Sequence, residues 1–367
     1  MLQKIINFFK LDISGNRVFG LDLLRSIAIL LVLIAHSREY LPISLQEGIN
    51  LFLVDGVAIF FVLSGFLIGG IIIKSFEKDI SIKSITNFWV RRWMRTLPNY
   101  YLILFVLLII NLLIGRWIEC LEYAKYLLFL QNSYFIIGDF FPESWSLSVE
   151  EWFYTIIPIL LLMISLLLGQ KISFKRKLFV IIILIILGVT FYRFVKYFNI
   201  EAKNYYTYDR YFLRQVFSRM DAIMFGVLGA WIRYYYSKIF YKGKKFGFWL
   251  GVLILILTHN FESIKDPILY IFAFSFTSFG VLLMLPLMDS WKSTTLGLRY
   301  PVVYCSLISY SMYLVNLSLI GNTLNQIELS NLLKFILFWF LTISLSIILY
   351  KYFEVPIIKW RDRITRK

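Results

Sequence analysis

Arg25 and His36, in the first long apolar segment, are the residues of this sequence best placed to act together in chemistry. Eleven helical steps of about 100° bring them to one face of a helix, roughly 16 Å apart along its axis. Ionisable side chains are costly inside a membrane, so they usually face a cavity or mark a functional site. An imidazole suits a general base because it titrates near neutral pH. The alternative is a buried histidine that only hydrogen-bonds its neighbours.

Arg92 and Arg95 lie three residues apart at the start of the third apolar segment, so they share one face of a helix. Guanidinium groups bind phosphate through paired hydrogen bonds, and the positive end of a helix adds to that attraction. The two arginines could therefore hold the phosphates of a nucleotide. The excess of positive charge that membrane proteins carry on their cytoplasmic side explains the same residues equally well.

The fourth apolar segment opens with Trp-Ser-Leu-Ser-Val-Glu at residues 145–150, and Glu151 follows. Either serine could cap a helix here, and an acidic residue in the first turn would complement the helix dipole. That explanation covers one carboxylate but fits less well with two neighbouring carboxylates at the edge of the hydrocarbon. We therefore interpret Glu150 as a residue that orients an imidazole or binds the hydroxyls of a substrate.

Arg219 and Asp221 place opposite charges two residues apart in the sixth apolar segment. An isolated charge is costly in a membrane, so we expect these two side chains to neutralise each other.

Two long segments predicted to lie outside the membrane, 116–147 and 196–214, are rich in aromatic residues. Aromatic rings at a membrane interface usually anchor the protein, and flat rings can also stack on the faces of a sugar. The residues concerned are Tyr134, Phe135, Phe140, Phe141 and Trp145 in the first segment, and Tyr205, Tyr206, Tyr208 and Tyr211 in the second.

Membrane helices must position all of these residues. The chain has 367 residues, of which 59% are hydrophobic and 16% charged, and its mean hydropathy is +0.74, values typical of a membrane protein. Ten apolar runs are long enough to cross a bilayer, and they are centred near residues 29, 62, 105, 160, 186, 224, 252, 278, 310 and 342. We predict an all-α integral membrane protein, a single polytopic bundle of about ten transmembrane helices.

The charge distribution predicts that both termini are cytoplasmic (N-in and C-in). If the helices alternate in direction from a cytoplasmic N-terminus, most Lys and Arg residues fall on the inner side and most acidic residues on the outer side. The net charge of +16 then reflects orientation and attraction to anionic membrane lipid, and no nucleic-acid motif accompanies it. Cys120 and Cys305 would lie on opposite sides, so we expect no disulfide between them, and no metal-ligand pattern is present.

Seven short motifs follow one another along the chain. The first is Arg25, ten residues and His36, and the second is Gly-Val-Ala-Ile-Phe-Phe-Val-Leu-Ser-Gly-Phe-Leu at residues 56–67. The others are Arg92-x-x-Arg95 and the stretches 145–150, 219–221, 309–314 and 353–356. In this order they resemble the acyltransferase-3 family of integral membrane acyltransferases, along essentially the full length of the chain.

The resemblance implies transfer of an acyl group, most often acetyl, from cytoplasmic acetyl-CoA or another acyl-CoA to a carbohydrate at the outer face of a bacterial cytoplasmic membrane, without a metal. The phosphates of the donor would bind Arg25, Arg92 and Arg95. His36 would act as general base or carry the acyl group covalently, and Glu150 would assist it. The residues that the resemblance places near the acceptor are Trp145, Ser148, Arg219, Asp221 and Asn316.

Asn316 departs from the pattern, because many relatives in that family have a second histidine there; its amide would have to fill that role. Residues 1–367 are expected to form one acyltransferase-3 membrane domain, without an appended extracytoplasmic hydrolase-like domain. The O-antigen of lipopolysaccharide, capsule or exopolysaccharide, peptidoglycan-linked sugars and a small lipid-linked saccharide all remain candidate acceptors. The competing interpretation is a transporter or flippase of a polysaccharide precursor, although we find neither an inverted repeat nor paired broken helices.

Overall fold

The computed structural model describes residues 11–13, 15, 17–115, 123–133, 138, 140–169, 172–199, 205–260, 267–295 and 297–365. Within these ranges every regular element is a helix. The long helices are α2 (Phe19–Ser37), α4 (Gly56–Phe76), α5 (Ile82–Leu113), α7 (Ser144–Leu168), α8 (Phe174–Asn199), α10 (Val216–Tyr235), α12 (Lys244–Asn260), α13 (Pro267–Ser290), α14 (Arg299–Val315) and α16 (Asn331–Leu349). The shorter elements are η1 (Arg38–Tyr40), α3 (Ile43–Asn50), η2 (Tyr123–Leu128), α9 (Tyr205–Tyr208), η4 (Asp209–Leu213), α11 (Ser237–Tyr241), η5 (Asn316–Gly321), α15 (Asn322–Asn325), η6 (Tyr350–Glu354) and α17 (Val355–Thr365).

Each of the ten predicted apolar runs forms a helix, and the protein is an all-α, multi-pass membrane protein. In the described part of the chain, eight helical segments are long and apolar enough to cross a membrane. The other two runs correspond to α10, which carries three charged residues, and to α12, which has only 17 residues. Ten crossings with both termini inside stay a prediction.

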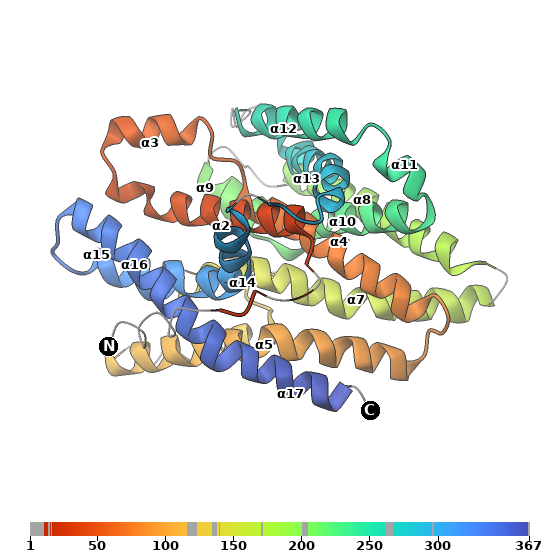
Figure 1. Ribbon diagram of the computed structural model, residues 1–367, viewed down its shortest axis with the longest axis horizontal. Helices are drawn as coiled ribbons and strands as arrows, with labels where there is room; N and C mark the ends of the chain where they lie inside the picture. Colours follow the sequence, from red (N-terminus) through yellow and green to blue (C-terminus); the bar gives the residue numbers. More distant parts are fainter. Residues whose placement is uncertain are drawn as a thin grey trace.

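Helices α2 and α10, which carry Arg25, His36, Arg219 and Asp221, lie in the middle of the bundle (Figure 1), whereas α5, which carries Arg92 and Arg95, lies at one edge. In this view α5 and α17 run along one edge and α12 lies along the opposite edge, with α2, α4, α10 and α14 between them. Helix α2 packs against α4 and α14, and α4 packs against α10. The end of α4, the start of α5 and the end of α17 meet at one end of the bundle, on the right of the picture.

Helices α4 and α10 approach each other closely because glycines face each other at their crossing. A Cβ atom added to Gly65 would lie 1.9 Å from the carbonyl oxygen of Ile223, and one added to Gly226 would lie 2.0 Å from that of Val62. No larger residue fits at either position without moving a backbone. The close contact brings the first turn of α4 next to the start of α10.

The charged residues of α10 pair with other helices, and the prediction that Arg219 and Asp221 neutralise each other is wrong. Nη2 of Arg219 donates to Oδ2 of Asp55 at 2.8 Å, whereas Asp221 pairs with Arg193 of α8 at 2.7 Å. Two residues on a helix are about 200° apart around its axis, so side chains at positions i and i+2 cannot face each other.

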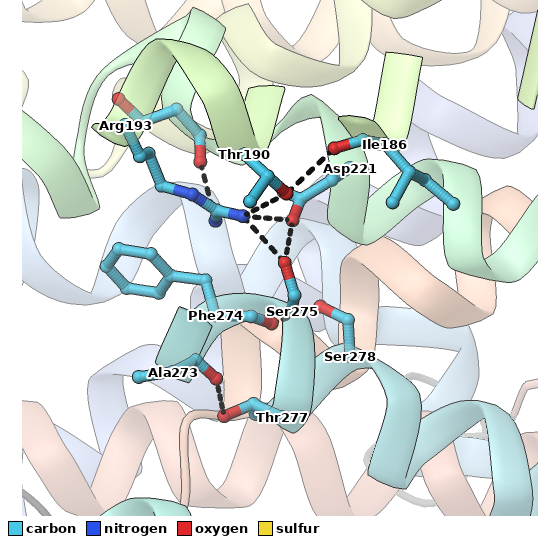
Figure 2. A network of polar contacts seen from close by, with 10 residues as sticks. Ile186, Thr190, Arg193, Asp221, Ala273, Phe274, Ser275, Thr277 and Ser278 are labelled. Carbon is cyan, nitrogen blue, oxygen red and sulfur yellow. Dashed lines mark hydrogen bonds and ion pairs between the residues drawn. The ribbon is translucent and has the colours of Figure 1, made fainter. Parts of the chain in front are cut away.

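The Arg193–Asp221 pair is buried where α8, α10 and α13 meet (Figure 2). Ser275 joins both side chains: its Oγ donates to Oδ2 of Asp221 at 2.7 Å and accepts from Nη2 of Arg193 at 2.6 Å. Both charged side chains are completely buried. A buried charge is tolerated only with such partners, so this network fixes the packing of the three helices.

Candidate active site

His36 lines a cavity of about 410 Å³, which we call the histidine cavity. It lies where the end of α2, the start of α4 and the start of α7 come together. Its wall contains both charged and aromatic side chains. The polar and aromatic residues that line it are His36, Arg38, Asp55, Glu143, Trp145, Tyr208, Asp209, Arg214, Thr258, His259, Phe274, Thr277 and Tyr313.

The imidazole of His36 is oriented by Asn316, whose Oδ1 lies 2.5 Å from Nδ1. The Nδ2 of Asn316 donates to the backbone carbonyls of Met312 at 3.0 Å and Tyr313 at 2.7 Å. These two carbonyls fix which end of the amide carries the nitrogen, so Oδ1 faces the imidazole. Because Oδ1 can only accept, Nδ1 must be the donor, and the neutral imidazole carries no proton on Nε2.

A second cavity of about 410 Å³, the central cavity, contains Arg25 and Glu150. The carboxylate of Glu150 accepts from the hydroxyl of Tyr154 at 3.0 Å, and that hydroxyl is also 3.0 Å from Oγ of Ser64. Arg92, Arg95 and Glu354 line the same space. The three predicted arginines, Arg25, Arg92 and Arg95, thus line the same cavity as the carboxylates of Glu150 and Glu354.

A third cavity of about 450 Å³, the terminal cavity, lies at the end of the bundle where α5 begins and α17 ends. Four arginines line it together with small polar side chains. Its polar lining residues are Ser75, Ser84, Asn87, Arg91, Arg92, Arg95 and Arg361. Four guanidinium groups around one space make a strong site for anions such as phosphate.

The three cavities adjoin one another in series. The terminal and central cavities share Arg92 and Arg95, and the central and histidine cavities share Val57 and Tyr313. The side chain of Tyr313 is held by Ser146, whose Oγ lies 2.7 Å from its hydroxyl. Val57 and Tyr313 therefore lie between the central cavity and the histidine cavity.

The structure separates several residues that the sequence had grouped. Glu150 lines the central cavity while His36 lines the histidine cavity, so the partner of the imidazole is Asn316 and not Glu150. Ser148 is completely buried and accepts a hydrogen bond from Nε2 of Gln131 at 2.5 Å. It lines none of the three cavities. Its role in this arrangement is to hold the start of α7.

Of the residues predicted to lie around the acceptor, some line the histidine cavity and others are buried outside it. Trp145 lines the histidine cavity, with its ring 5.9 Å from the guanidinium carbon of Arg219. Arg219 itself is buried behind the wall, over the ring of Phe274 at 4.3 Å. Asp221 lies in the Arg193 network and does not line the histidine cavity. Asp55, the partner of Arg219, does line it.

The aromatic residues of the two outer segments serve different purposes. Phe140 and Phe141 are buried in the protein core, where they neither anchor the protein nor contact a sugar. Tyr208 lines the histidine cavity. Cys120, Tyr134 and Phe135 and the side chains of Tyr205 and Tyr206 lie outside the described residues.

Several polar residues of the cavities and of the network behind them were not predicted from the sequence. Asp55 precedes a long apolar run, which is the signature of a helix N-cap, and this signal could have identified it. Arg193 interrupts an apolar segment and could have been found as a charge within the membrane. Glu143 and Arg214 give no such signal, because both lie in polar connections between the helices.

The fold is that of a polytopic membrane protein, and comparison with known proteins gives its class. A family model described as an acyltransferase domain matches residues 18–351. The chain belongs to this acyltransferase-3 family. No solved structure matches the chain.

Individual relatives are similar over part of the chain. The peptidoglycan O-acetyltransferase OatA of Listeria monocytogenes is 33% identical over 163 residues, which are 41% of this chain and 25% of OatA. A Bacillus subtilis protein, YrhL, provisionally named a peptidoglycan O-acetyltransferase, is 36% identical over 156 residues, 39% of this chain and 23% of YrhL. A Staphylococcus aureus protein provisionally named an O-acetyltransferase is 33% identical over 171 residues. Each match spans about a quarter of the relative's length.

Proposed function

We propose that this protein is an O-acetyltransferase that moves an acetyl group from acetyl-CoA to a hydroxyl of a cell-surface glycan. The observation that carries the proposal is the series of three cavities, with arginines at one end and the imidazole of His36 at the other. A donor with a phosphate-rich head and a thioester at the far end of a thin arm fits this order. Membership of the acyltransferase-3 family supports the same reaction.

The donor would bind with its phosphates in the terminal cavity. Arg91, Arg92, Arg95 and Arg361 supply the positive charge there, and Arg25 continues it into the central cavity. The arm would then run through the central cavity, where Glu150 and Tyr154 offer hydrogen-bond partners to its amide groups. Its thioester would reach the histidine cavity beside Val57 and Tyr313.

The acceptor would bind in the histidine cavity. Its wall combines flat aromatic rings, such as Trp145 and Tyr208, with the carboxylates of Asp55 and Asp209. Sugars are commonly bound by this combination, because their hydroxyls donate to carboxylates and their apolar faces pack on rings. The names of OatA and YrhL favour a peptidoglycan-type glycan as the acceptor over lipopolysaccharide or exopolysaccharide.

In the proposed step, Nε2 of His36 takes the proton of the acceptor hydroxyl while its oxygen attacks the thioester carbonyl carbon. The carbon–sulfur bond then breaks, and the imidazolium returns the proton to the leaving thiolate of CoA. Asn316 supports this step because it fixes the tautomer in which Nε2 accepts. In a two-step variant, Nε2 attacks the thioester first, and the carbon–sulfur bond breaks to release the CoA thiolate. The acceptor hydroxyl then attacks the acyl-imidazole, the carbon–nitrogen bond breaks, and the proton of the hydroxyl passes to the thiolate.

The test uses the purified full-length protein in proteoliposomes supplied with acetyl-CoA and soluble peptidoglycan fragments. Acceptor-dependent release of CoA thiol and a mass increase of one acetyl group on the fragments are the expected results, and both should disappear in H36A. Movement of saccharide across the bilayer without thioester cleavage would instead establish a transporter. Acetylation that persists in H36A would overturn the role of His36.

A further inference from the structure

Asn316 begins a π-helical turn, η5, which interrupts the path of α14. A π-helical turn is rare, and it occurs mostly at functional sites because it redirects side chains that a regular helix would place elsewhere. Here it places the amide of Asn316 against the imidazole of His36. The turn needs support from its surroundings, because its backbone geometry is less favourable than that of an α-helix.

Three side chains hold this turn. His36 bonds Asn316 at its first residue, and the hydroxyl of Tyr40 donates to the carbonyl of Gly321 at its last residue, at 3.3 Å. The third is Glu143, at the N-cap of α7, which binds Ser318 in the middle of the turn.

The contact between Glu143 and Ser318 is the most complete of these attachments, because it consists of two hydrogen bonds. The backbone N–H of Ser318 donates to Oε1 of Glu143 at 3.0 Å, and the hydroxyl of Ser318 donates to Oε2 at 2.5 Å. Both side chains are buried, Glu143 to 2% exposure. One carboxyl group thus holds Ser318 at both its backbone and its side chain, so this pair is a strong clamp.

We propose that Glu143 is a positioning residue for His36: it clamps the π-helical turn at Ser318 and thereby keeps Asn316 in place to hold Nδ1 of the imidazole. The proposal rests on the proposed function, in which His36 is the base. Its chain of contacts runs from Glu143 to Ser318 through two hydrogen bonds of 3.0 Å or less, along the backbone of the turn to Asn316, and from Asn316 to His36 through a hydrogen bond of 2.5 Å. Loss of the clamp would release the amide and leave the tautomer of His36 unspecified.

Three variants test the clamp by kinetics. E143A removes both acceptors, whereas E143Q keeps an acceptor for the backbone N–H and offers a donor to the hydroxyl of Ser318. We expect E143A to lower kcat by roughly tenfold or more with KM for acetyl-CoA unchanged, and E143Q to stay within about threefold of wild type. In an N316A background, E143A should have little further effect, because Glu143 acts through Asn316. Equal losses in E143A and E143Q, or additive losses with N316A, would overturn the proposal.

Nuclear magnetic resonance tests the clamp without activity. The chain contains only two histidines, so protein labelled with ¹⁵N-histidine gives two imidazole signal sets, which H259N assigns. In wild type, His36 should show a protonated Nδ1 and an unprotonated Nε2. E143A should give a mixture of both tautomers while E143Q keeps the wild-type signals. An unchanged tautomer in folded, monodisperse E143A would refute the clamp.

These outcomes separate this proposal from the proposed function. If H36A and N316A abolish transfer while E143A behaves like wild type, the clamp fails and the general base stands. If H36A keeps full activity, the proposed mechanism fails, and the tautomer measurement still decides whether Glu143 orders the imidazole.

Discussion

The carboxylate of Asp55 and the guanidinium of Arg219 meet at 2.8 Å, although 164 residues separate them in the sequence. Asp55 uses its other oxygen to cap α4, accepting from the backbone N–H groups of Val57 at 2.9 Å and Ala58 at 3.0 Å. Arg219 lies over the ring of Phe274 on α13. One ion pair therefore joins three helices at the wall of the histidine cavity.

The two roles of Asp55 can be separated by substitution. D55A should lower the free energy of unfolding by about 1 kcal/mol through loss of the cap, and by more through the unpaired, buried cation of Arg219. D55N keeps the cap and loses only the charge, so it should be clearly more stable than D55A. Thermal unfolding in detergent measures the difference; identical melting temperatures for the two variants would contradict the dual role.

The Arg193–Asp221 pair predicts strong coupling between α8 and α10. Either single variant, R193M or D221L, leaves a buried charge without its partner and should cost about 3–5 kcal/mol. The double variant removes both charges, so it should be more stable than either single variant. A double-mutant cycle of thermal stabilities checks this, and additive losses would show that the two charges are not coupled in the folded protein.

The position of Val57 between the central and histidine cavities predicts a variant that blocks the reaction without blocking donor binding. The indole of V57W should fill the space between the central and histidine cavities and keep the thioester from His36. Acetyl transfer should fall by about a hundredfold, while binding of CoA, measured by calorimetry, stays as in wild type. V57A, which shortens the side chain at the same position, is the matched control and should transfer acetyl groups at least as fast as wild type. Parallel loss of CoA binding in V57W would place the donor elsewhere.

Arg361 of α17 is expected to bind the phosphates of the donor. Charge-assisted hydrogen bonds contribute about 1.5–3 kcal/mol each, so R361A should raise KM for acetyl-CoA by about tenfold or more and leave kcat nearly unchanged. K359A removes the same charge from an exposed position on the same helix, outside the lining of the terminal cavity. It should have almost no effect. If K359A and R361A raise KM equally, the effect is one of general surface charge.

The raised pKa of Glu143 predicts that the stability of the folded protein depends on pH. Burial raises the pKa of Glu143 to about 7 from its usual 4.5, against the two hydrogen bonds from Ser318 that lower it. At pH values between 4.5 and about 7, Glu143 is protonated in the folded protein and ionised in the unfolded chain. The contribution of this proton to the free energy of unfolding is therefore present at low pH and declines as the pH rises towards 7. E143Q mimics the protonated form. Its melting temperature relative to wild type should therefore rise from pH 5 to pH 8, and a constant difference would disagree with the raised pKa.

The helices themselves follow from sequence pattern. Apolar runs of about twenty residues leave few alternatives to a membrane helix, and a helical period places Arg25 and His36 on one side of α2. In the structure they line two neighbouring cavities, as their separation along the helix requires. The helical period predicts the relative positions of Arg25 and His36 because both residues belong to α2.

The sequence pattern does not identify which residues make contact between helices. The period of α10 could have excluded a contact between Arg219 and Asp221, but it names neither Asp55 nor Arg193 as the true partners. Likewise Asn316 reaches His36 across 280 residues of sequence through a π-helical turn that no local pattern announces. These partners depend on how the helices pack, and packing is decided by shape over many residues at once.

The contact of Gly65 with Gly226 has a mechanical consequence. Because the backbones of α4 and α10 touch there, the two helices cannot slide or rotate past each other without a collision, and they behave as one rigid body. Val57 belongs to that body. The contact of two glycines therefore fixes the position of Val57, the residue of α4 that lines both the central and the histidine cavities.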